Sequence, residues 1–567
     1  MGSPADTIKL MGLYSEMRRR NVFKVAMLYV IVAWLLLRAT DYLLPRLGFP
    51  HWADEFVVVL VLIGFPLALF FAYIYEVTPE GLKKAVDVDQ TQSIVYKTGQ
   101  KLNAALAVLL VLVIASLAVS RLFPTFPIDD EEPAAHIAKP GIPSEIRSRT
   151  LENGLEIIVW PDHDIPNVVM YNFVRVGSRN EYPGITGLSH FFEHMMFNGT
   201  STREPGEFDR VMEAAGGANN AYTSSDVTVY QNWFPRSALE IIFELEADRL
   251  ENLTTDPEVF ESERGVVYSE RRTAVDDNNL MRLYEQVQAT AYVAHPYQFP
   301  VIGWPSDIEG WTHEDVMDFY RTYYAPNNLT MVFTGDVTAA EVFALAEEYF
   351  EPIPAQQPPD PVRTVEPEQQ GERRLIVEVD AQTPMLHMAF HVGAAHDPET
   401  LPMRLLLEIL VGGDSSRLHQ LLVEREGLAI SVDGFQDEGF DPGLVYFYLT
   451  LPPDADVEQV ETRLFQSLAA VAADGVTEAE VIKARNIILA DFWRKLATID
   501  GKAGALGNFE VFYGGYEKLF GLPVEIDQLT AEDLRAVAAD VFRRNNMTVG
   551  VLRSPEARPQ APAEETP

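Results

Sequence analysis

The sequence predicts an α+β fold that contains two copies of one unit of roughly 200 residues, preceded by an all-α membrane region. The first observation is a repeat without gaps: Thr312–Val316 (THEDV) recurs as Thr530–Leu534 (TAEDL), and Asn328 recurs as Asn546, each 218 positions later. The second observation is that strand-like alternation and helix-like apolar spacing are mixed within each copy. The third is a set of long apolar runs before residue 125.

The first 124 residues carry three apolar runs, each near the roughly 20 residues that a helix needs to cross a bilayer. The runs are Phe23–Leu44, Phe56–Tyr75 and Leu102–Leu122. Basic residues gather before the first run and between the second and third, and basic loops remain in the cytoplasm. We therefore expect three transmembrane helices in the lipid bilayer of a bacterial inner membrane. The N-terminus would be cytoplasmic and the chain after the third run periplasmic.

Proline and acidic residues divide the remainder of the chain. Residues 125–143 are rich in both, which predicts a semi-extended tether. A second such stretch, 352–371, is predicted to be a linker between the two copies, which then occupy 144–351 and 372–555. The end of the chain, 556–567, is rich in Pro, Ala and Glu and is predicted to be disordered.

Each copy shows both kinds of periodicity. In the first copy, Asn167–Val176 alternates as a strand does, and Ala238–Leu253 has the apolar spacing of a helix. In the second copy, Leu375–Val379 and Thr477–Leu496 show the same two patterns. This mixture is typical of α+β domains.

Residues His190–His194 (HFFEH) are predicted to place two imidazoles and a carboxylate on one helical face. His190 and His194 are four residues apart, so they lie one helical turn apart and can bind a single metal ion. Glu193 lies beside them. This HxxEH order is the inverse of the commoner HExxH zinc signature. A catalytic zinc takes three protein ligands and keeps one position for water, so a third ligand is expected elsewhere in the chain.

Glu270 is the best candidate for that third ligand. Glu263 and Glu270 are seven residues apart in a helix-like run, and two turns of helix put both carboxylates on the same side. One can bind zinc while the other orients a histidine ligand. Two such acids by themselves more often form a solvated helix face. The histidine motif upstream favours the zinc site.

The stretch Val174–Thr200 resembles the active-site region of the pitrilysin-type (M16) zinc peptidases, which include mitochondrial processing peptidase and insulin-degrading enzyme. The resemblance continues through Asn220–Thr223, His295–Tyr297 and Tyr324–Asn328, and covers about residues 140–555. It implies two duplicated M16-like domains of the short, processing-peptidase type. The expected activity is that of a zinc-dependent metalloendopeptidase with one Zn²⁺ per chain.

The resemblance also implies the roles of individual residues. Zinc would be held by His190, His194 and Glu270, which follows His194 by 76 residues, the spacing found in that family. Glu193 would be the general base that takes a proton from water. Glu263 would support the catalytic site by orienting a histidine.

In that family an edge strand pairs with the extended peptide substrate, and here this strand would carry Asn220 and Ala221. The residues themselves leave an alternative open. Gly216 and Gly217 stand just upstream, so Asn219–Asn220 could instead form an ordinary turn.

The second copy has lost the metal motif. A shift of 215 residues from the HxxEH motif reaches Leu405, Glu408 and Ile409, so both histidines are replaced by aliphatic residues. The family has the same asymmetry, which implies one zinc domain and one inactive domain enclosing a chamber.

One departure from the family concerns substrate binding. Many relatives hold the substrate with an Arg and a Tyr that lie seven residues apart, where this chain has Val423 and Ile430. Neither side chain can donate a hydrogen bond. Either Arg425 compensates from a neighbouring turn, or a homo- or hetero-oligomer with a second M16-like chain supplies the pair.

Composition limits the remaining possibilities. The chain has no cysteine, which excludes disulfides and a thiolate zinc site. Residues 1–124 hold 12 Lys and Arg against 9 Asp and Glu, whereas the rest holds 32 against 74. The second part lacks the basic balance of nucleic-acid-binding proteins. An acidic chamber could favour basic peptides, although solubility explains the charge equally well.

Two other functions remain open at this point. The chain could be a non-catalytic M16-like scaffold, or a subunit whose periplasmic part only binds or senses peptides. Arg18–Ala26, Phe65–Pro66 and Thr78–Leu82 resemble a membrane module of some bacterial signalling proteins, a likeness that says nothing about catalysis. Zinc content measured together with peptide turnover separates both from a peptidase.

Overall fold

The computed structural model describes residues 141–254 and 256–555, a hairpin and a few single positions before them. The hairpin pairs β1 (Tyr75–Thr78) with β2 (Gly81–Lys84). The predicted membrane spans, most of the tether and residues 556–567 lie outside the described residues. None of the described helices is long and apolar enough to cross a bilayer. Residues 1–135 and 136–567 form two separate units, and the second is described below.

The first half of this unit contains a six-stranded sheet in the order β3-β4-β8-β5-β7-β6. Strands β4 and β8 run parallel, and every other neighbouring pair is antiparallel. Strand β6 forms one edge. The strands are β3 (Arg147–Thr150), β4 (Glu156–Pro161), β5 (Asn167–Val174), β6 (Ala218–Thr223), β7 (Thr228–Pro235) and β8 (Leu329–Gly335).

The second half repeats this topology. Its sheet has the order β11-β12-β10-β13-β9, which matches β6-β7-β5-β8-β4 strand for strand. The pair β9 and β13 is again parallel. The predicted α+β fold with two copies of one unit is therefore confirmed. The strands are β9 (Arg373–Glu378), β10 (Met385–His391), β11 (Ser431–Gln436), β12 (Leu444–Thr450) and β13 (Met547–Arg553).

The repeated asparagines make equivalent bonds in both halves. The amide of Asn328 donates to the carbonyl of Tyr323 at 2.9 Å, and the amide of Asn546 donates to the carbonyl of Val541 at 3.0 Å. Each bond satisfies a carbonyl at the end of a helix just before the strand that follows it. The repeat in the sequence thus records a repeated helix-to-strand connection.

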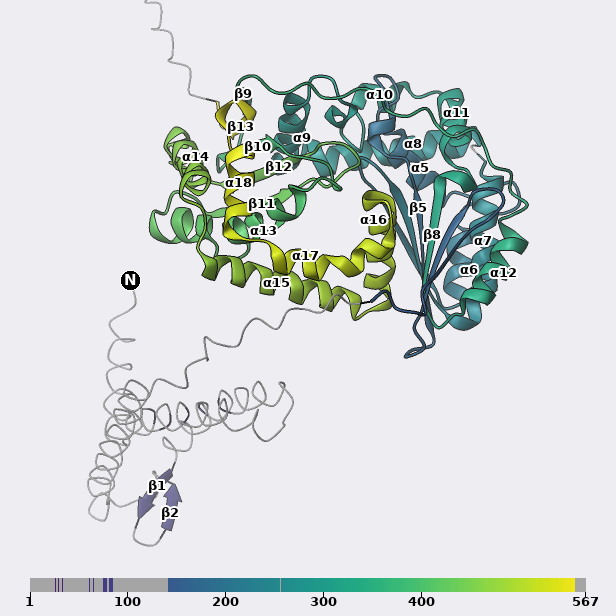
Figure 1. The fold of residues 1–567 in the computed structure, drawn as a ribbon, viewed down its shortest axis with the longest axis horizontal. Coiled ribbons are helices and arrows are strands. Elements are labelled where there is room, and N and C mark those ends of the chain that lie inside the picture. Colours follow the sequence, from purple (N-terminus) through teal and green to yellow (C-terminus); the bar gives the residue numbers. More distant parts are fainter. Residues whose placement is uncertain are drawn as a thin grey trace, which may run out of the picture. The chain divides into compact units, whose positions relative to one another are not determined.

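Helices of each half cover one face of that half's own sheet (Figure 1). In the first half they are α5 (Leu188–Met195), α6 (Glu207–Ala214), α7 (Leu239–Asn252), α8 (Pro257–Arg271), α11 (His313–Tyr323) and α12 (Ala339–Tyr349). In the second half they are α13 (Thr400–Val411), α14 (Val457–Asp474) and α18 (Ala531–Val541). The short helices α10 (Pro305–Gly310) and α17 (Leu522–Gln528) lie in the connections.

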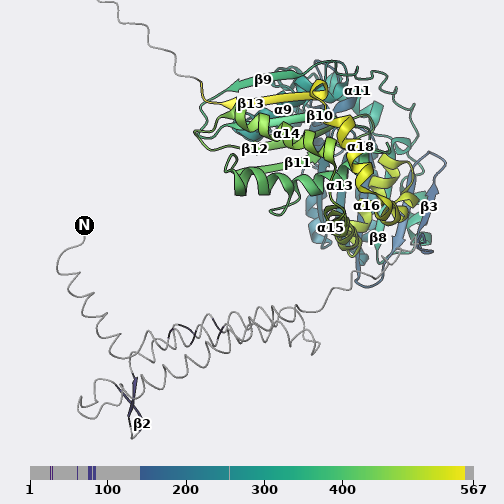
Figure 2. The ribbon, with the colours of Figure 1, turned by 60° about the vertical axis from the view of Figure 1, so that its left-hand side comes forward.

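The two halves exchange helices across their other faces. Helix α9 (Asn279–Ala291) of the first half packs on β13, β10 and β9 of the second. Helix α16 (Ile499–Tyr513) of the second half packs on β8 and β5 of the first, next to α15 (Glu478–Leu496) (Figures 1 and 2). Neither sheet is covered on both faces without the other half, so the halves form one folded body.

The predicted elements agree closely with the structure. The predicted strands correspond to β5 and β9, and the predicted helices to α7 and α15, with differences of one or two residues at the ends. Thr477 precedes α15 as its N-cap and accepts a hydrogen bond from the backbone of Glu480. Residues 352–371 contain no helix or strand.

Candidate active site

Helix α5 carries the HxxEH motif and is fixed at its first turn. The buried carboxylate of Glu181 accepts hydrogen bonds from the backbone N–H groups of Gly187 and Ser189, both at 2.7 Å. These N–H groups have no partner inside the helix, and a negative charge is favourable at a helix N-terminus. Burial nevertheless raises the pKa of Glu181 to about 7. On the other side of the motif, Phe191 and Phe192 are fully buried in the core.

The structure brings His190, His194 and Glu270 together. Nε2 of His194 lies 3.4 Å from Oε2 of Glu270, and Nε2 of His190 lies 3.7 Å from the same atom. One potential ligand atom from each residue falls within 4.8 Å of the others. Helix α5 contributes the histidines and α8 contributes the glutamate.

These residues fit a zinc ion. Tetrahedral bonds of about 2.0–2.2 Å to two nitrogens and one oxygen would separate the ligand atoms by about 3.3 Å. The two histidine nitrogens lie 3.4 Å and 3.7 Å from the Glu270 oxygen, close to this value. Two histidines and a glutamate form one of the ligand sets found in catalytic zinc sites. Burial, helped by the neighbouring His194, lowers the pKa of His190 to about 4, so its imidazole is neutral as a ligand must be.

Glu263 contacts His194 at Nδ1, the ring nitrogen that does not face Glu270. Its Oε1 lies 2.7 Å from Nδ1 of His194, and its Oε2 accepts a hydrogen bond from the amide of Asn198 at 2.9 Å. Burial disfavours a charge on His194, but Glu263 and Glu270 outweigh it and raise its pKa to about 9. With Nδ1 bound to Glu263, Nε2 of His194 faces Glu270, as a carboxylate-oriented metal ligand requires.

Glu193 points to the neighbouring strand β6. The hydroxyl of Thr223 donates a hydrogen bond of 2.6 Å to Oε2 of Glu193. Burial raises the pKa of Glu193, while the bond from Thr223 opposes this shift. Thr223 closes the motif Asn220–Thr223, but its contact with Glu193 depends on a sheet edge meeting a helix and was not predicted.

Asn220 and Ala221 lie in β6, at the free edge of the first sheet. The alternative of a turn at Asn219–Asn220 is therefore wrong, because both residues pair with β7. The chain reverses earlier, at Gly216, whose φ of +83° favours glycine. The edge strand thus stands beside Glu193 with its backbone groups available on one side.

Comparison with known proteins agrees with this site. Residues 163–303 match the family described as "Insulinase (Peptidase family M16)", and residues 310–488 match "Peptidase M16 inactive domain". The chain is 30% identical over 411 residues to "Zinc protease PqqE" of Helicobacter pylori. The matched region covers 72% of this chain and 92% of that protein. The chain belongs to the M16 peptidase family.

Two solved structures resemble this M16 family member over its second unit. A protease from Helicobacter pylori has a TM-score of 0.70 at 29% identity, covering 72% of this chain and 99% of its own. A putative M16-like peptidase from Alicyclobacillus acidocaldarius has a TM-score of 0.64 at 23% identity, covering 74% and 100%. The second likeness concerns the fold alone.

The second domain has no equivalent metal site among its described residues. Leu405 and Ile409, which replace the two histidines, are buried in the core of that domain. Val423 packs partly against the same core, while Ile430 is 53% exposed beside the edge strand β11. Arg425 is exposed and forms no ion pair within residues 141–254 and 256–555.

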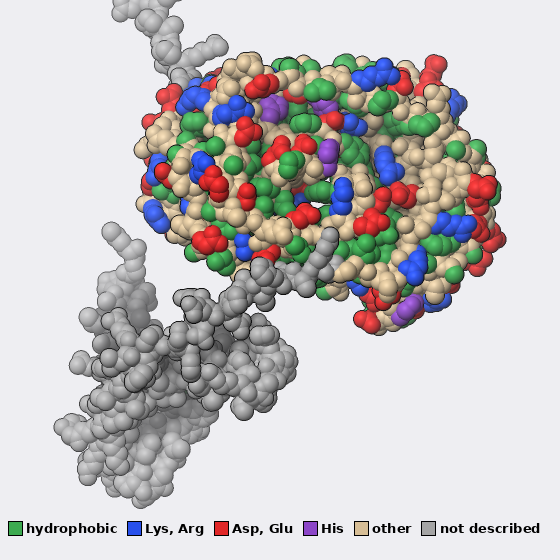
Figure 3. All heavy atoms as spheres, in the orientation of Figure 1, with side chains coloured by type: hydrophobic (Ala, Val, Ile, Leu, Met, Phe, Trp, Pro, Cys, Tyr) green, Lys and Arg blue, Asp and Glu red, His purple; other side chains and the backbone are tan. Residues whose placement is uncertain are grey.

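A cavity of about 750 Å³ lies between the two domains, and the face in Figure 3 is hollowed near its middle. The walls of the cavity include Tyr171 and Tyr222 from the first domain and Glu408 and Phe512 from the second. The space is therefore bounded by both domains, as a chamber requires.

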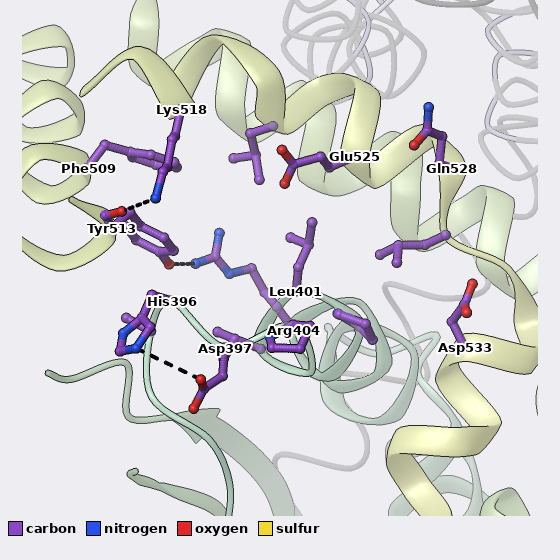
Figure 4. Close-up of a pocket in the computed structure, with 16 residues that line it drawn as sticks. His396, Asp397, Leu401, Arg404, Phe509, Tyr513, Lys518, Glu525, Gln528 and Asp533 are labelled. Atoms are coloured by element: carbon purple, nitrogen blue, oxygen red, sulfur yellow. Dashed lines mark hydrogen bonds and ion pairs between the residues drawn. The ribbon is translucent and has the colours of Figure 1, made fainter. Parts of the chain in front are cut away.

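A further cavity of about 460 Å³ lies within the second domain (Figure 4). Its basic side chains already have partners. Arg404 donates to the hydroxyl of Tyr513 at 3.0 Å, and Lys518 donates to the backbone carbonyl of Tyr513 at 2.5 Å. His396 lies 3.9 Å from Asp397. These interactions account for the basic side chains of the cavity as parts of the fold.

Proposed function

We propose that this M16 family member is a zinc-dependent metalloendopeptidase that hydrolyses peptides or unfolded segments in the chamber between its domains. The observation that carries the proposal is the convergence of His190, His194 and Glu270 beside Glu193. Relatives named zinc proteases support the metal.

The chemistry follows from the side chains around this point. Zinc, when bound, would polarise the substrate carbonyl and make water acidic enough to lose a proton near neutral pH. Glu193 would accept that proton and later donate it to the leaving amine. Thr223 would hold the carboxylate in place, and Glu263 would keep His194 correctly oriented.

The peptide would bind as an added strand on β6. The free edge of β6 offers backbone donors and acceptors next to Glu193, and strand addition is a general mode of peptide recognition. Asn220 and Ala221 would be the contact residues. This arrangement explains why an extended or unfolded segment is the expected substrate.

The decisive experiment is Glu193→Gln. The ligands remain, so zinc content should stay at one per chain while peptide cleavage is lost. His194→Ala should lower zinc content as well. Glu251→Gln removes an exposed carboxylate of α7 and serves as the matched control, with zinc and cleavage retained. Full zinc content in His194→Ala, or normal cleavage by Glu193→Gln, would contradict the proposal.

We further propose that three N-terminal helices anchor the enzyme in the inner membrane, with the N-terminus in the cytoplasm and the peptidase in the periplasm. The support is the length of the apolar runs and the position of basic residues. A reporter active only outside the cytoplasm should work when fused after Pro127 and fail after Lys84. An inactive fusion at Pro127 would place the peptidase in the cytoplasm.

The replacement of the Arg/Tyr pair leads to a proposal about partners. We expect a hetero-oligomer in which a second, different M16-like chain supplies these groups, because Val423 and Ile430 cannot hold a peptide carbonyl. Residues 140–555 alone should bind zinc but cleave slowly, and addition of the partner should restore the rate. Vigorous cleavage by this chain alone would refute the requirement.

A scaffold or peptide-sensing subunit is the alternative function. It is favoured by the match of the second domain to a family described as inactive. The first domain, however, keeps the full set of metal-binding residues and Glu193 in contact with Thr223. A pure scaffold has no need of this arrangement.

A further inference from the structure

A separate cavity of about 390 Å³ opens beside Glu193, between α5, α6 and the edge strand β6. Phe197, Asp209 of α6 and Asn219 of β6 line it together with Glu193 and His194. Its position next to the proposed general base means that a group bound here belongs to the substrate near the bond that is cleaved.

Three carboxylates and one imidazole line this cavity, and the imidazole, that of His194, is already engaged by Glu263. The carboxylates are those of Glu193, Asp209 and Glu263, and no Lys or Arg lines the cavity. Arg249, whose guanidinium lies 5.3 Å from the centre of the Phe197 ring, is paired with Glu246 at 2.6 Å. The acidic field in the cavity is therefore not neutralised by a free cation from its wall.

Asp209 is the one carboxylate of the three that has no role in the proposed zinc site or its chemistry. Glu193 is held by Thr223, and Glu263 is engaged by His194 and Asn198. Oδ1 of Asp209 accepts a hydrogen bond of 3.0 Å from the amide of Asn219. Within residues 141–254 and 256–555, no interaction engages Oδ2 of Asp209, and no basic side chain pairs with it.

The strand geometry directs a substrate side chain to this carboxylate. Side chains alternate between the two faces of a sheet, so a peptide added to β6 places every second side chain on the face of Asn219 and Ala221. That face is the one towards α5 and α6, because Asn219 bonds Asp209 and Thr223 bonds Glu193.

We infer that this cavity is a specificity subsite for a Lys or Arg side chain adjoining the cleaved bond, and that Asp209 selects it. The inference rests on the proposed peptidase function and adds the substrate class. The aliphatic stem would lie against Phe197, and the cationic end would reach the free oxygen of Asp209. A charge-assisted hydrogen bond in a partly enclosed site discriminates strongly against neutral side chains.

The test uses the full-length, zinc-loaded protein and peptides that differ only at the two residues flanking the cleaved bond. At one of these positions, Lys and Arg should give a kcat/KM at least about tenfold above Leu, and Glu the lowest value. Asp209→Asn should reduce this ratio to near one. Asp209→Lys should favour the Glu peptide.

The matched control is Glu213→Gln, which makes the same charge change on an exposed position of α6. It should keep the preference for Lys and Arg. Equal cleavage of Lys, Leu and Glu peptides by the wild-type protein would overturn the inference. So would a preference that survives in Asp209→Asn.

Peptide affinity for the Glu193→Gln protein separates this inference from the proposed function. Binding does not require turnover, so the Lys peptide should still bind at least about tenfold more tightly than the Leu peptide. That preference, lost in the Glu193→Gln, Asp209→Asn double variant, supports the subsite even if the wild-type protein cleaves nothing. Equal affinities in a protein that cleaves peptides would overturn the subsite alone.

Discussion

Single hydrogen bonds decide how the reactive side chains of the site are oriented. Glu193 could rotate freely on the helix surface if the hydroxyl of Thr223 did not hold one of its oxygens. His194 is held in the same way by Glu263, which in turn is held by Asn198. A positioned carboxylate and an oriented imidazole are conditions for general base catalysis and for metal binding.

Thr223→Val tests this orientation at the residue scale. The substitution keeps the shape of the side chain and removes the donor, so zinc should remain bound while kcat falls about 10- to 100-fold, the range expected for loss of a hydrogen bond to a charged group. Thr223→Ser restores the hydroxyl and should recover most of the rate. A rate unchanged in Thr223→Val would show that Glu193 does not depend on this bond.

At the scale of elements, helix α5 is short and depends on its surroundings. It has only eight residues, and helices this short are marginal by themselves. Its stability comes from the burial of Phe191 and Phe192 and from Glu181 at its first turn. The metal-binding face is thus held rigid by contacts that never touch the metal.

Glu181→Gln tests the fixed first turn. A Gln side chain has one acceptor oxygen, so one of the N–H groups of Gly187 and Ser189 would lose its partner. We expect the free energy of unfolding to fall by about 1–3 kcal/mol and zinc affinity to weaken, measured by denaturation and by metal competition. Glu251→Gln should change neither quantity. Unaltered stability and zinc affinity in Glu181→Gln would assign the rigidity of α5 to its apolar face alone.

At the scale of the whole molecule, the exchange of α9 and α16 joins the two domains. The close approach of α16 to the first sheet depends on Gly507, where an added Cβ would lie 2.0 Å from the ring of Phe173. The equivalent contact of α9 depends on Gly550, where a Cβ would lie 2.3 Å from Val287. Both contacts require a residue without a side chain.

Gly507→Ala tests the contact between α16 and the first sheet. The added methyl group must displace Phe173, so we expect a loss of about 1–3 kcal/mol in the free energy of unfolding. Gly504→Ala, one turn earlier on the same helix, meets only Tyr171 at 3.7 Å and should be neutral or stabilising by up to about 1 kcal/mol. Denaturation of both variants measures the difference. Equal stabilities would mean that α16 shifts freely on the sheet.

The sequence by itself determined the features that are local or repeated. The HxxEH motif, the two-turn spacing of Glu263 and Glu270 and the 218-residue repeat depend only on helical geometry and on duplication, so they can be read from residue spacing. The structure also brings the three proposed ligands together, a convergence of two helices that the resemblance to the M16 family implied and that helical spacing alone does not specify.

Only the tertiary structure decided the contacts between distant elements. Thr223 meets Glu193, Glu181 caps α5 and Asp209 faces a cavity because a sheet edge, a loop and a helix converge there. Spacing along the chain carries no information about such meetings. The exchange of α9 and α16 between the domains could not be predicted from the sequence either, because an apolar helix face does not specify which of two similar sheets it will cover.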